Sequence, residues 1–141
     1  KKTIADENLI EAVNRQDDRL RNGLQKIADK NPFVGDVRGR GLFLGIEFVA
    51  NKETKKPIPQ GSALATAIKK AGFDHNLLLY PGSGTADGKE GCHILFGPPF
   101  IARGTEIDEM LLRISRVIED CLPIMEHFAS THLSLPPKTL E

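Results

Sequence analysis

Hydrophobic and polar positions recur along the chain with two different periods. Residues 3–30 carry apolar side chains at helical spacing with charges between them, which predicts a long amphipathic helix that ends at Asn31-Pro32. The same period predicts a short helix over residues 60–72 and a long one over residues 105–121. The last helix has a regular apolar face made of Ile107, Met110, Leu111, Ile114, Val117, Ile118 and Cys121.

Three shorter segments are expected to be strands. Residues 42–49, "LFLGIEFV", are rich in β-branched and aromatic side chains, and residues 77–80 and 93–97 are short apolar runs. A glycine-rich stretch joins the last two, which favours antiparallel pairing while leaving a crossover open. The order α-β-α-β-β-α predicts an α/β (α+β two-layer) fold: a small, three-stranded, mainly antiparallel sheet with helices packed on it.

The end of the chain is expected to lack regular structure. Pro123 is expected to end or kink the last helix, because proline has no N–H and its ring clashes with the preceding turn. From Ser130 the sequence "STHLSLPPKTLE" is polar and contains proline, which is typical of coil. We therefore predict one domain over residues 1–129 and a polar tail over residues 130–141.

Composition and charge narrow the classes of function. Lys plus Arg and Asp plus Glu both total 19, so the net charge is zero and gives no argument for binding nucleic acid or an acidic membrane. No apolar run approaches the ~20 residues of a membrane-spanning helix. The two cysteines, Cys92 and Cys121, lack the spacing of a zinc site and are expected to be reduced thiols. These features predict a cytoplasmic protein without metal, nucleic-acid or membrane partners.

The stretch "YPGSGTADGKEG", residues 80–91, has some features of a phosphate-binding loop. The P-loop pattern requires a glycine at position 83 and a hydroxyl residue at position 90, where this chain has Ser83 and Glu90. A P-loop also opens a helix whose amides face the phosphate, whereas this stretch leads into a predicted strand. The residues therefore favour a flexible loop between strands that another surface orders.

Two further candidates are a thiol–imidazole pair and a strand carboxylate. Cys92 and His93 are neighbours on a predicted strand, so their side chains are expected to point to opposite faces and not to form a nucleophile–base contact. Glu47 lies in the middle of an apolar strand. It is either an active-site carboxylate or a surface residue paired with Arg38 or Arg40. No complete catalytic set follows from these residues.

Four segments, taken in order, resemble one family. They are "ENLIEAVNRQDDRLRNGLQKIADKNPFVGDVRGRGLFLGIEFV", "ETKKPIP", "LLLYPGSGTADG" and "HILFGPPFI", the last followed by "EIDEML". Their order and spacing are similar to the C-terminal small domain of class III pyridoxal-phosphate aminotransferases, the ω-transaminase-like group of fold type I. The resemblance runs from about Asp6 to Cys121.

This resemblance implies an enzyme that transfers an amino group from an amine or amino acid to a keto acid or aldehyde through pyridoxal phosphate. In the family, a large domain that precedes the small one carries the Schiff-base lysine and most cofactor contacts. Residues 1–129 are therefore expected to be one lobe of the substrate cleft, inactive alone. The implied partners are the large domain of the same polypeptide, a second subunit of a homodimer, and amine and keto acid substrates.

The resemblance also identifies candidate substrate-binding residues, Tyr80, Gly82 and Ser83. Relatives carry a substrate-carboxylate arginine in the third strand or at the end of the second, and the matching positions here are Leu95 and Tyr80. Neither residue can form a bidentate guanidinium clamp, so we expect Tyr80 to line a hydrophobic or mixed pocket, or else to be a core aromatic. Gly82 and Ser83 are expected to let a neighbouring domain or subunit approach the backbone.

Two other kinds of protein remain open at this point. One is a stand-alone α/β module that binds a small ligand or regulates, with the glycine-rich loop closing over an anion. The other is a scaffold domain whose apolar faces bind a partner chain.

Overall fold

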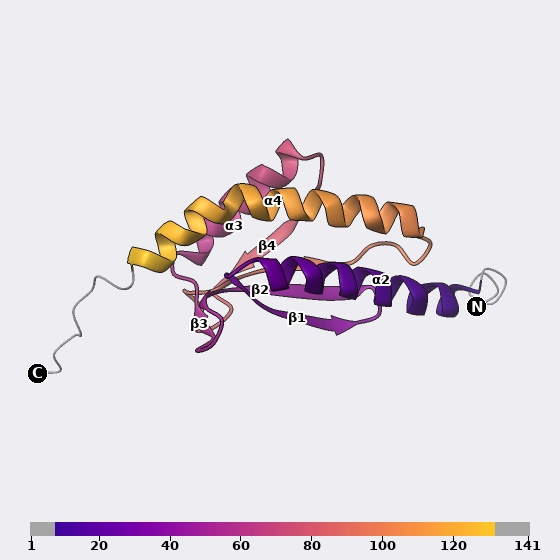
Figure 1. Cartoon of the computed structure of the whole chain (residues 1–141), viewed down its shortest axis with the longest axis horizontal. Coiled ribbons are helices and arrows are strands. Elements are labelled where there is room, and N and C mark those ends of the chain that lie inside the picture. The colour runs from indigo at the N-terminus through magenta and orange to yellow at the C-terminus, as the bar shows by residue number, and fades with distance from the viewer. Residues whose placement is uncertain (1–7, 132–141) are drawn as a thin grey trace, which may run out of the picture.

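The sheet and the helices form two layers (Figure 1). The computed structural model describes residues 8–131. Its helices and strands are α2 (Leu9–Lys30), β1 (Val34–Arg40), β2 (Phe43–Asn51), β3 (Lys56–Pro57), α3 (Gly61–Asp74), β4 (Tyr80–Ser83), β5 (Cys92–Phe96) and α4 (Gly104–Thr131). The sheet order is β1-β2-β5-β4, with β3 also paired to β2, and every pairing is antiparallel. The predicted fold class and the antiparallel pairing of the last two strands are confirmed.

The prediction of only three strands is wrong, because β1 and β3 also join the sheet. Residues 34–40, "VGDVRGR", are not among the predicted strands, yet they form β1 and pair with β2 through a tight hairpin. The sequence does not indicate this strand, because its glycines and charged side chains leave no alternating apolar pattern. At the hairpin Gly39 has φ +135°, and a Cβ there would lie 2.1 Å from the Phe43 carbonyl oxygen. Only glycine fits such a close approach.

The second predicted strand is displaced toward the C-terminus. Pairing starts at Tyr80 and continues to Ser83, so residues 77–79 are not part of the sheet. These residues instead follow the end of α3, where the Leu77 N–H donates to the Gly72 carbonyl at 2.8 Å. Leu79 is buried against the core without a sheet partner, which explains why its apolar character suggested a strand.

Pro123 was expected to end or kink the last helix, and the helix continues beyond it to Thr131, so the first of these two outcomes is wrong. The apolar face extends past the proline through Met125 and Phe128, both buried, and this packing holds the final turns. The helix ends at Thr131, so the first two residues of the predicted tail are helical, and residues 132–141 lie outside the described part. The predicted first turn of the N-terminal helix, before residue 8, also lies outside it.

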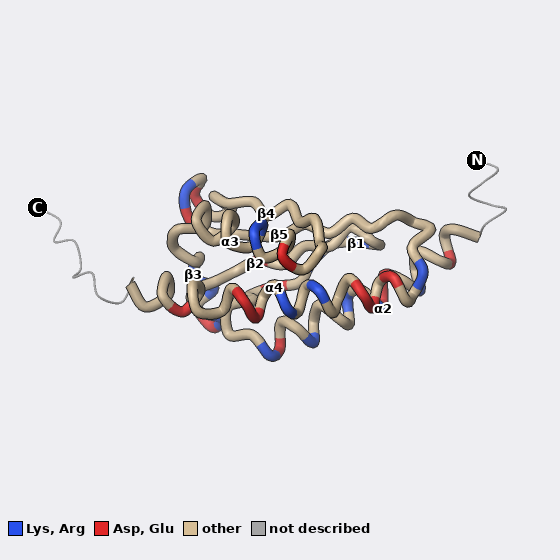
Figure 2. Tube along the Cα trace, turned by 90° about the horizontal axis from the view of Figure 1, so that it is seen from above, with Lys and Arg blue, Asp and Glu red and all other residues tan. Residues whose placement is uncertain are grey.

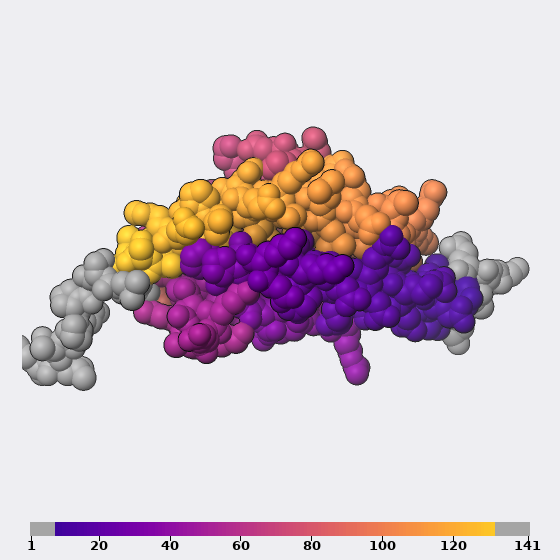
Figure 3. All heavy atoms as spheres, viewed as in Figure 1, coloured from indigo at the N-terminus to yellow at the C-terminus, as the bar shows by residue number. Residues whose placement is uncertain are grey.

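The core lies between the sheet and the helices, and β2 shows how it is built. Leu44, Ile46 and Phe48 alternate along this strand and are at most 2% exposed. Helices α2 and α4 pack side by side above them (Figure 3), and α3 lies over β4 and β5. Burying each such side chain contributes about 2 kcal/mol. All three helices cover one face of the sheet, so the opposite face stays open (Figure 1).

The outer surface of the helices carries charges of both signs, as Figure 2 shows along α2. Arg19 of α2 donates to both carboxylate oxygens of Asp108 of α4, at 2.7 and 2.6 Å, and so links the two helices. Residues 8–131 contain no helix long and apolar enough to cross a membrane.

Candidate functional site

The glycine-rich loop between β4 and β5 is held by hydrogen bonds of its own. The Gly84 N–H donates to the Gly91 carbonyl at 3.1 Å, and the Gly88 N–H donates to the Gly84 carbonyl at 3.0 Å. Gly84, Gly88 and Gly91 all have φ between +74° and +90°, which explains the choice of glycine. The Gly91 N–H also donates to the Ile58 carbonyl at 3.0 Å, which ties the loop to the segment before α3.

Asp87 organises the tip of this loop. Its Oδ1 accepts hydrogen bonds from the backbone N–H groups of Glu90 at 2.7 Å and Lys89 at 2.9 Å. These two bonds, that from Glu90 first, hold the pKa of the Asp87 carboxyl below its usual range. The loop therefore has hydrogen bonds of its own, and the expectation that another surface orders it stays a prediction. In a phosphate-binding loop such backbone N–H groups would donate to the ligand. Here the N–H groups of Lys89 and Glu90 donate to the Asp87 carboxylate, so the rejection of a P-loop stands.

Two of the three candidate substrate-binding residues lie on the open face of the sheet. Tyr80 is 72% exposed and pairs with Leu95, which is 46% exposed, so the two side chains are neighbours. Gly82 pairs with His93, and a Cβ on Gly82 would lie 2.5 Å from the imidazole. The imidazole of His93 therefore fills the space next to Gly82. Ser83 pairs with the buried Cys92 and belongs to the opposite face, at the exposed edge of the sheet.

Cys92 and His93 point to opposite faces, as expected from strand alternation. Cys92 is fully buried, and burial raises the pKa of its thiol to about 12, with a smaller contribution from nearby Cys121. Burial also raises the pKa of Cys121 to about 11. His93 lies on the open face, where its Nδ1 shares a 2.8 Å hydrogen bond with the Thr85 hydroxyl. The buried thiols are thus unsuited to nucleophilic chemistry at neutral pH.

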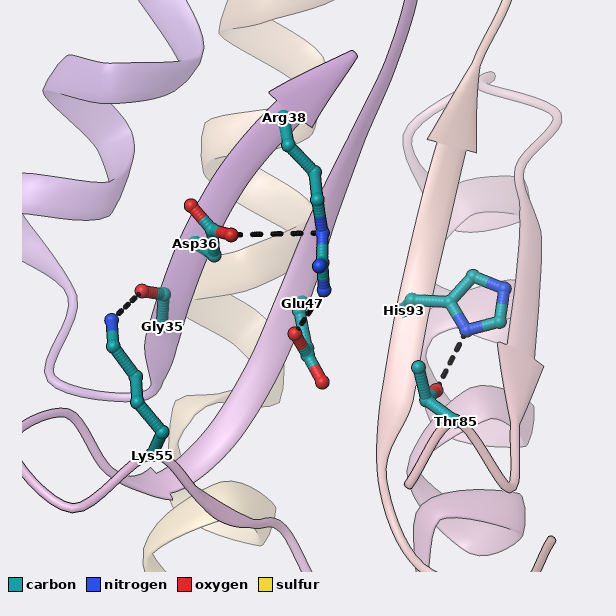
Figure 4. A network of polar contacts seen from close by, with 7 residues as sticks. All are labelled: Gly35, Asp36, Arg38, Glu47, Lys55, Thr85 and His93. Atoms are coloured by element: carbon teal, nitrogen blue, oxygen red, sulfur yellow. Dashed lines mark hydrogen bonds and ion pairs between the residues drawn. The ribbon is translucent and has the colours of Figure 1, made fainter. Parts of the chain in front are cut away.

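The open face also carries an ionic cluster on β1 and β2 (Figure 4). Arg38 forms an ion pair with Glu47 and a weaker one with Asp36, whose Oδ2 lies 3.6 Å from the guanidinium Nε. Of the two interpretations of Glu47, the pairing with Arg38 is the one that the structure shows. Because this pairing places a carboxylate on each side of the guanidinium, Arg38 is not free to bind a substrate carboxylate.

Between this cluster and β5 the open face is hollowed. The hollow has a volume of about 490 Å³. Its lining includes Arg38, Gly39, Phe43, Gly45, Glu47, Thr85, His93 and Leu95. Sequence reasoning missed this feature, although one signal was present: in "FLGIE" a glycine stands between two outward positions of the same strand. Thr85 and its contact with His93 were also missed, since they depend on the register of β4 against β5.

The described residues do not offer a site for covalent attachment of an aldehyde cofactor. Every lysine within residues 8–131 is exposed or half-buried, and none lines the hollow. Lys52 and Lys55 donate to the carbonyls of Ala28 and Gly35, and Lys70 pairs with Asp74, which raises the pKa of its ammonium. No cluster of His, Cys, Asp or Glu in this part of the chain could hold a metal ion.

Comparison with known proteins assigns the chain to a family. The model of class-III aminotransferases matches residues 2–118. An uncharacterized aminotransferase of Schizosaccharomyces pombe is 38% identical over 112 residues, covering 79% of this chain and 24% of the relative. A taurine–pyruvate aminotransferase of Bilophila wadsworthia is 38% identical over 114 residues, covering 80% of this chain and 24% of the relative. The chain thus spans about a quarter of the length of the curated relatives it matches.

Solved structures agree with this assignment. A transaminase from the marine bacterium Virgibacillus superposes with a TM-score of 0.77 at 27% identity, covering 88% of this chain and 27% of that one. The ω-transaminase of Pseudomonas jessenii in complex with PMP superposes with a TM-score of 0.73 at 27% identity, covering 88% of this chain and 25% of that one. Because the family model spans most of the chain, and both sequence and fold agree with it, the chain belongs to the class-III aminotransferase family.

Proposed function

We propose that this chain is the C-terminal lobe of a pyridoxal-phosphate-dependent aminotransferase and forms one wall of its substrate cleft. Class III aminotransferases depend on pyridoxal phosphate. The observation that carries the proposal is the family match over residues 2–118 in a chain that spans only about a quarter of its relatives. In the proposed enzyme, other parts of the polypeptide supply the Schiff-base lysine, and a second subunit completes a homodimer.

Tyr80 is the residue that we assign to the substrate wall. It is largely exposed at the start of β4, and its register partner on β5 is Leu95. These are the two positions at which the resemblance implies arginines in relatives, and the register places them side by side. Both are uncharged here, so the proposed wall offers apolar surface and one phenolic hydroxyl instead of a carboxylate clamp. We therefore propose amine donors with uncharged side groups as preferred substrates, with a keto acid or aldehyde as acceptor.

The test of this role is a specificity measurement on the intact enzyme. Tyr80→Ala should change the ratio of kcat/KM for a bulky and a small amine donor by about tenfold, because a pocket wall typically contributes about 1–3 kcal/mol to discrimination. Phe73→Ala is the matched control, since Phe73 is an aromatic residue on α3 and is 60% exposed. An unchanged ratio would remove Tyr80 from the substrate wall.

The role as one lobe has its own test on the 141-residue chain. Incubation with pyridoxal phosphate followed by borohydride reduction should add no stoichiometric mass increment at a single lysine, because every lysine within residues 8–131 is exposed or half-buried and none lines the hollow. A single fully modified lysine would show that the chain carries a cofactor site itself, and the proposal would then be wrong.

A further inference from the structure

The hollow on the open face is bordered by two chemically different groups along β2. It lies over Gly45, where a Cβ would stand 3.1 Å from the Leu95 side chain. Along β2, the neighbouring outward residues are Phe43 at one end and Glu47 at the other. Phe43 is 63% exposed, so apolar surface borders one end. A carboxylate borders the other end.

Among residues 8–131, the two carboxylates at the acidic end form ion pairs with one cation, Arg38. Asp36 and Glu47 share the single guanidinium of Arg38. Arg38 binds Glu47 through Oε2, and Oε1 accepts no hydrogen bond from residues 8–131. His93 does not compensate, because its ring turns away from Glu47 toward Thr85 (Figure 4). Lys55 donates to the Gly35 carbonyl instead (Figure 4).

The next cation along β1 is also too far away to help. Arg40 stands opposite Phe43, four register positions from the pair of Asp36 and Glu47, and does not line the hollow. The acidic end therefore retains an excess of one negative charge beside an apolar wall. A ligand that matches both ends has an aliphatic body and a terminal cation.

We propose that the hollow is a socket for a lysine or arginine side chain contributed by polypeptide outside this chain. The proposal rests on the proposed function, in which the longer enzyme supplies the polypeptide that covers this face. The aliphatic stem packs between Phe43 and Leu95, and the cationic head reaches the Glu47 carboxylate. About three quarters of the length of the relatives lies outside the matched region, so such a segment is available.

Three capped amino acids test the chemistry of the socket without any substitution. The chain, labelled with ¹⁵N, is titrated with the N-acetyl N-methylamides of lysine, norleucine and glutamate, and amide shifts are followed by NMR. Norleucine keeps the stem of lysine and lacks the ammonium. We expect the lysine derivative to bind about threefold more tightly than norleucine, as for a solvent-exposed ion pair, with shifts at residues 43–47 and 93–95. Equal binding of all three probes, or shifts on the helical face, would overturn the proposal.

Variants then assign the selectivity to named groups. Glu47→Gln should abolish the preference for lysine over norleucine, whereas Glu53→Gln, at an exposed residue in the turn after β2, should leave it unchanged. Gly45→Val should weaken the binding of the lysine and norleucine derivatives, because the valine side chain would fill the part of the hollow that lies over residue 45. A preference that survives Glu47→Gln contradicts the assignment. The titration does not depend on catalysis, so an intact protein without aminotransferase activity would refute the proposed function and leave the socket standing.

Discussion

On β2, Leu44, Ile46 and Phe48 lie beneath the helices and are almost inaccessible, whereas Phe43, Gly45 and Glu47 alternate with them on the face that no helix covers. The helix-covered face is a complete core in which apolar side chains from all three helices meet the sheet. The open face combines exposed apolar side chains with a charged cluster and a hollow.

The difference between the two faces shows which part of the molecule is self-sufficient. A half-covered antiparallel sheet normally turns polar residues outward. Here Phe43, Tyr80 and Leu95 are outward and between 46% and 72% exposed, which is typical of a surface that meets another body. Folding should therefore depend on the helix-covered face, and substitutions on the open face should affect recognition more than stability.

The largest expected effect is a charge placed in the helix-covered core. Ile114 lies at the centre of α4 and is fully buried, so Ile114→Asp should cost about 4 kcal/mol or more and leave the chain largely unfolded. Leu112→Asp is the matched control, because Leu112 lies on the same helix and is 48% exposed. Circular dichroism during thermal unfolding measures both. A normal melting temperature for Ile114→Asp would mean that the buried face of α4 is assigned wrongly.

A pair of substitutions on one strand compares the two faces directly. Ile46→Ala removes a side chain that is 2% exposed and should cost about 2–5 kcal/mol. Phe43→Ala removes a larger side chain three residues away on the open face and should cost less than about 1 kcal/mol in the 141-residue chain. Urea unfolding gives both values. If Phe43→Ala were the more destabilising, the open face would belong to the core.

An intermediate effect is expected where the glycine-rich loop meets α3. A Cβ on Gly61 would lie 1.9 Å from the Gly91 carbonyl oxygen, which is backbone and cannot rotate away, so Gly61→Ala should cost about 3 kcal/mol. Gly88→Ala meets no atom within 4 Å and suffers only from its φ of +81°, at about 1 kcal/mol. The two urea midpoints decide between these costs. Equal costs would show that the loop is not anchored on α3.

The periodicity of the sequence was sufficient to predict the helix-covered layer, because an element that is buried on one side repeats its apolar residues at a regular spacing. The apolar positions of residues 105–121 are those that pack inward on α4, and the segment 42–49 became β2 with small changes at its ends. The strand β1 was missed because it is an edge strand with charged and glycine residues, so no apolar repeat marks it.

The contacts within the candidate site could not be predicted from local sequence patterns. Tyr80 was identified from the family resemblance, but its contact with Leu95 follows from the register between two strands that are separated by the loop. The hydrogen bond between Thr85 and His93 and the crowding of Gly82 by the imidazole have the same origin. Asp87 was overlooked because a short turn closed by one carboxylate looks like any polar glycine-rich segment.

The smallest expected effect is electrostatic and concerns the outer surface of the helix layer. The Asp108 carboxylate accepts two hydrogen bonds from Arg19, and these bonds, with the attraction of the guanidinium, hold the pKa of Asp108 below its usual range. A carboxyl group with a pKa that is lower in the folded than in the unfolded chain stabilises the fold above the unfolded pKa. That contribution disappears as the pH falls through the folded value. Both side chains are about half exposed, which limits the effect by solvent screening.

Asp108→Asn should therefore lower the urea midpoint slightly at about pH 7, and the difference from the parent chain should shrink as the pH falls through the folded pKa of Asp108, because the parent carboxylate then becomes protonated too. Asp18→Asn is the matched control, since Asp18 is an exposed carboxylate on α2 with no ion pair among residues 8–131. High salt should reduce the difference at neutral pH, because exposed ion pairs are screened. A difference between Asp108→Asn and the parent that persists unchanged at low pH would mean that the asparagine disturbs packing near Arg19 and Gly104, where the guanidinium lies 2.6 Å from the position of a Cβ. In that case the link between α2 and α4 would be steric, and the charge of Asp108 would add nothing to the stability of the helix layer.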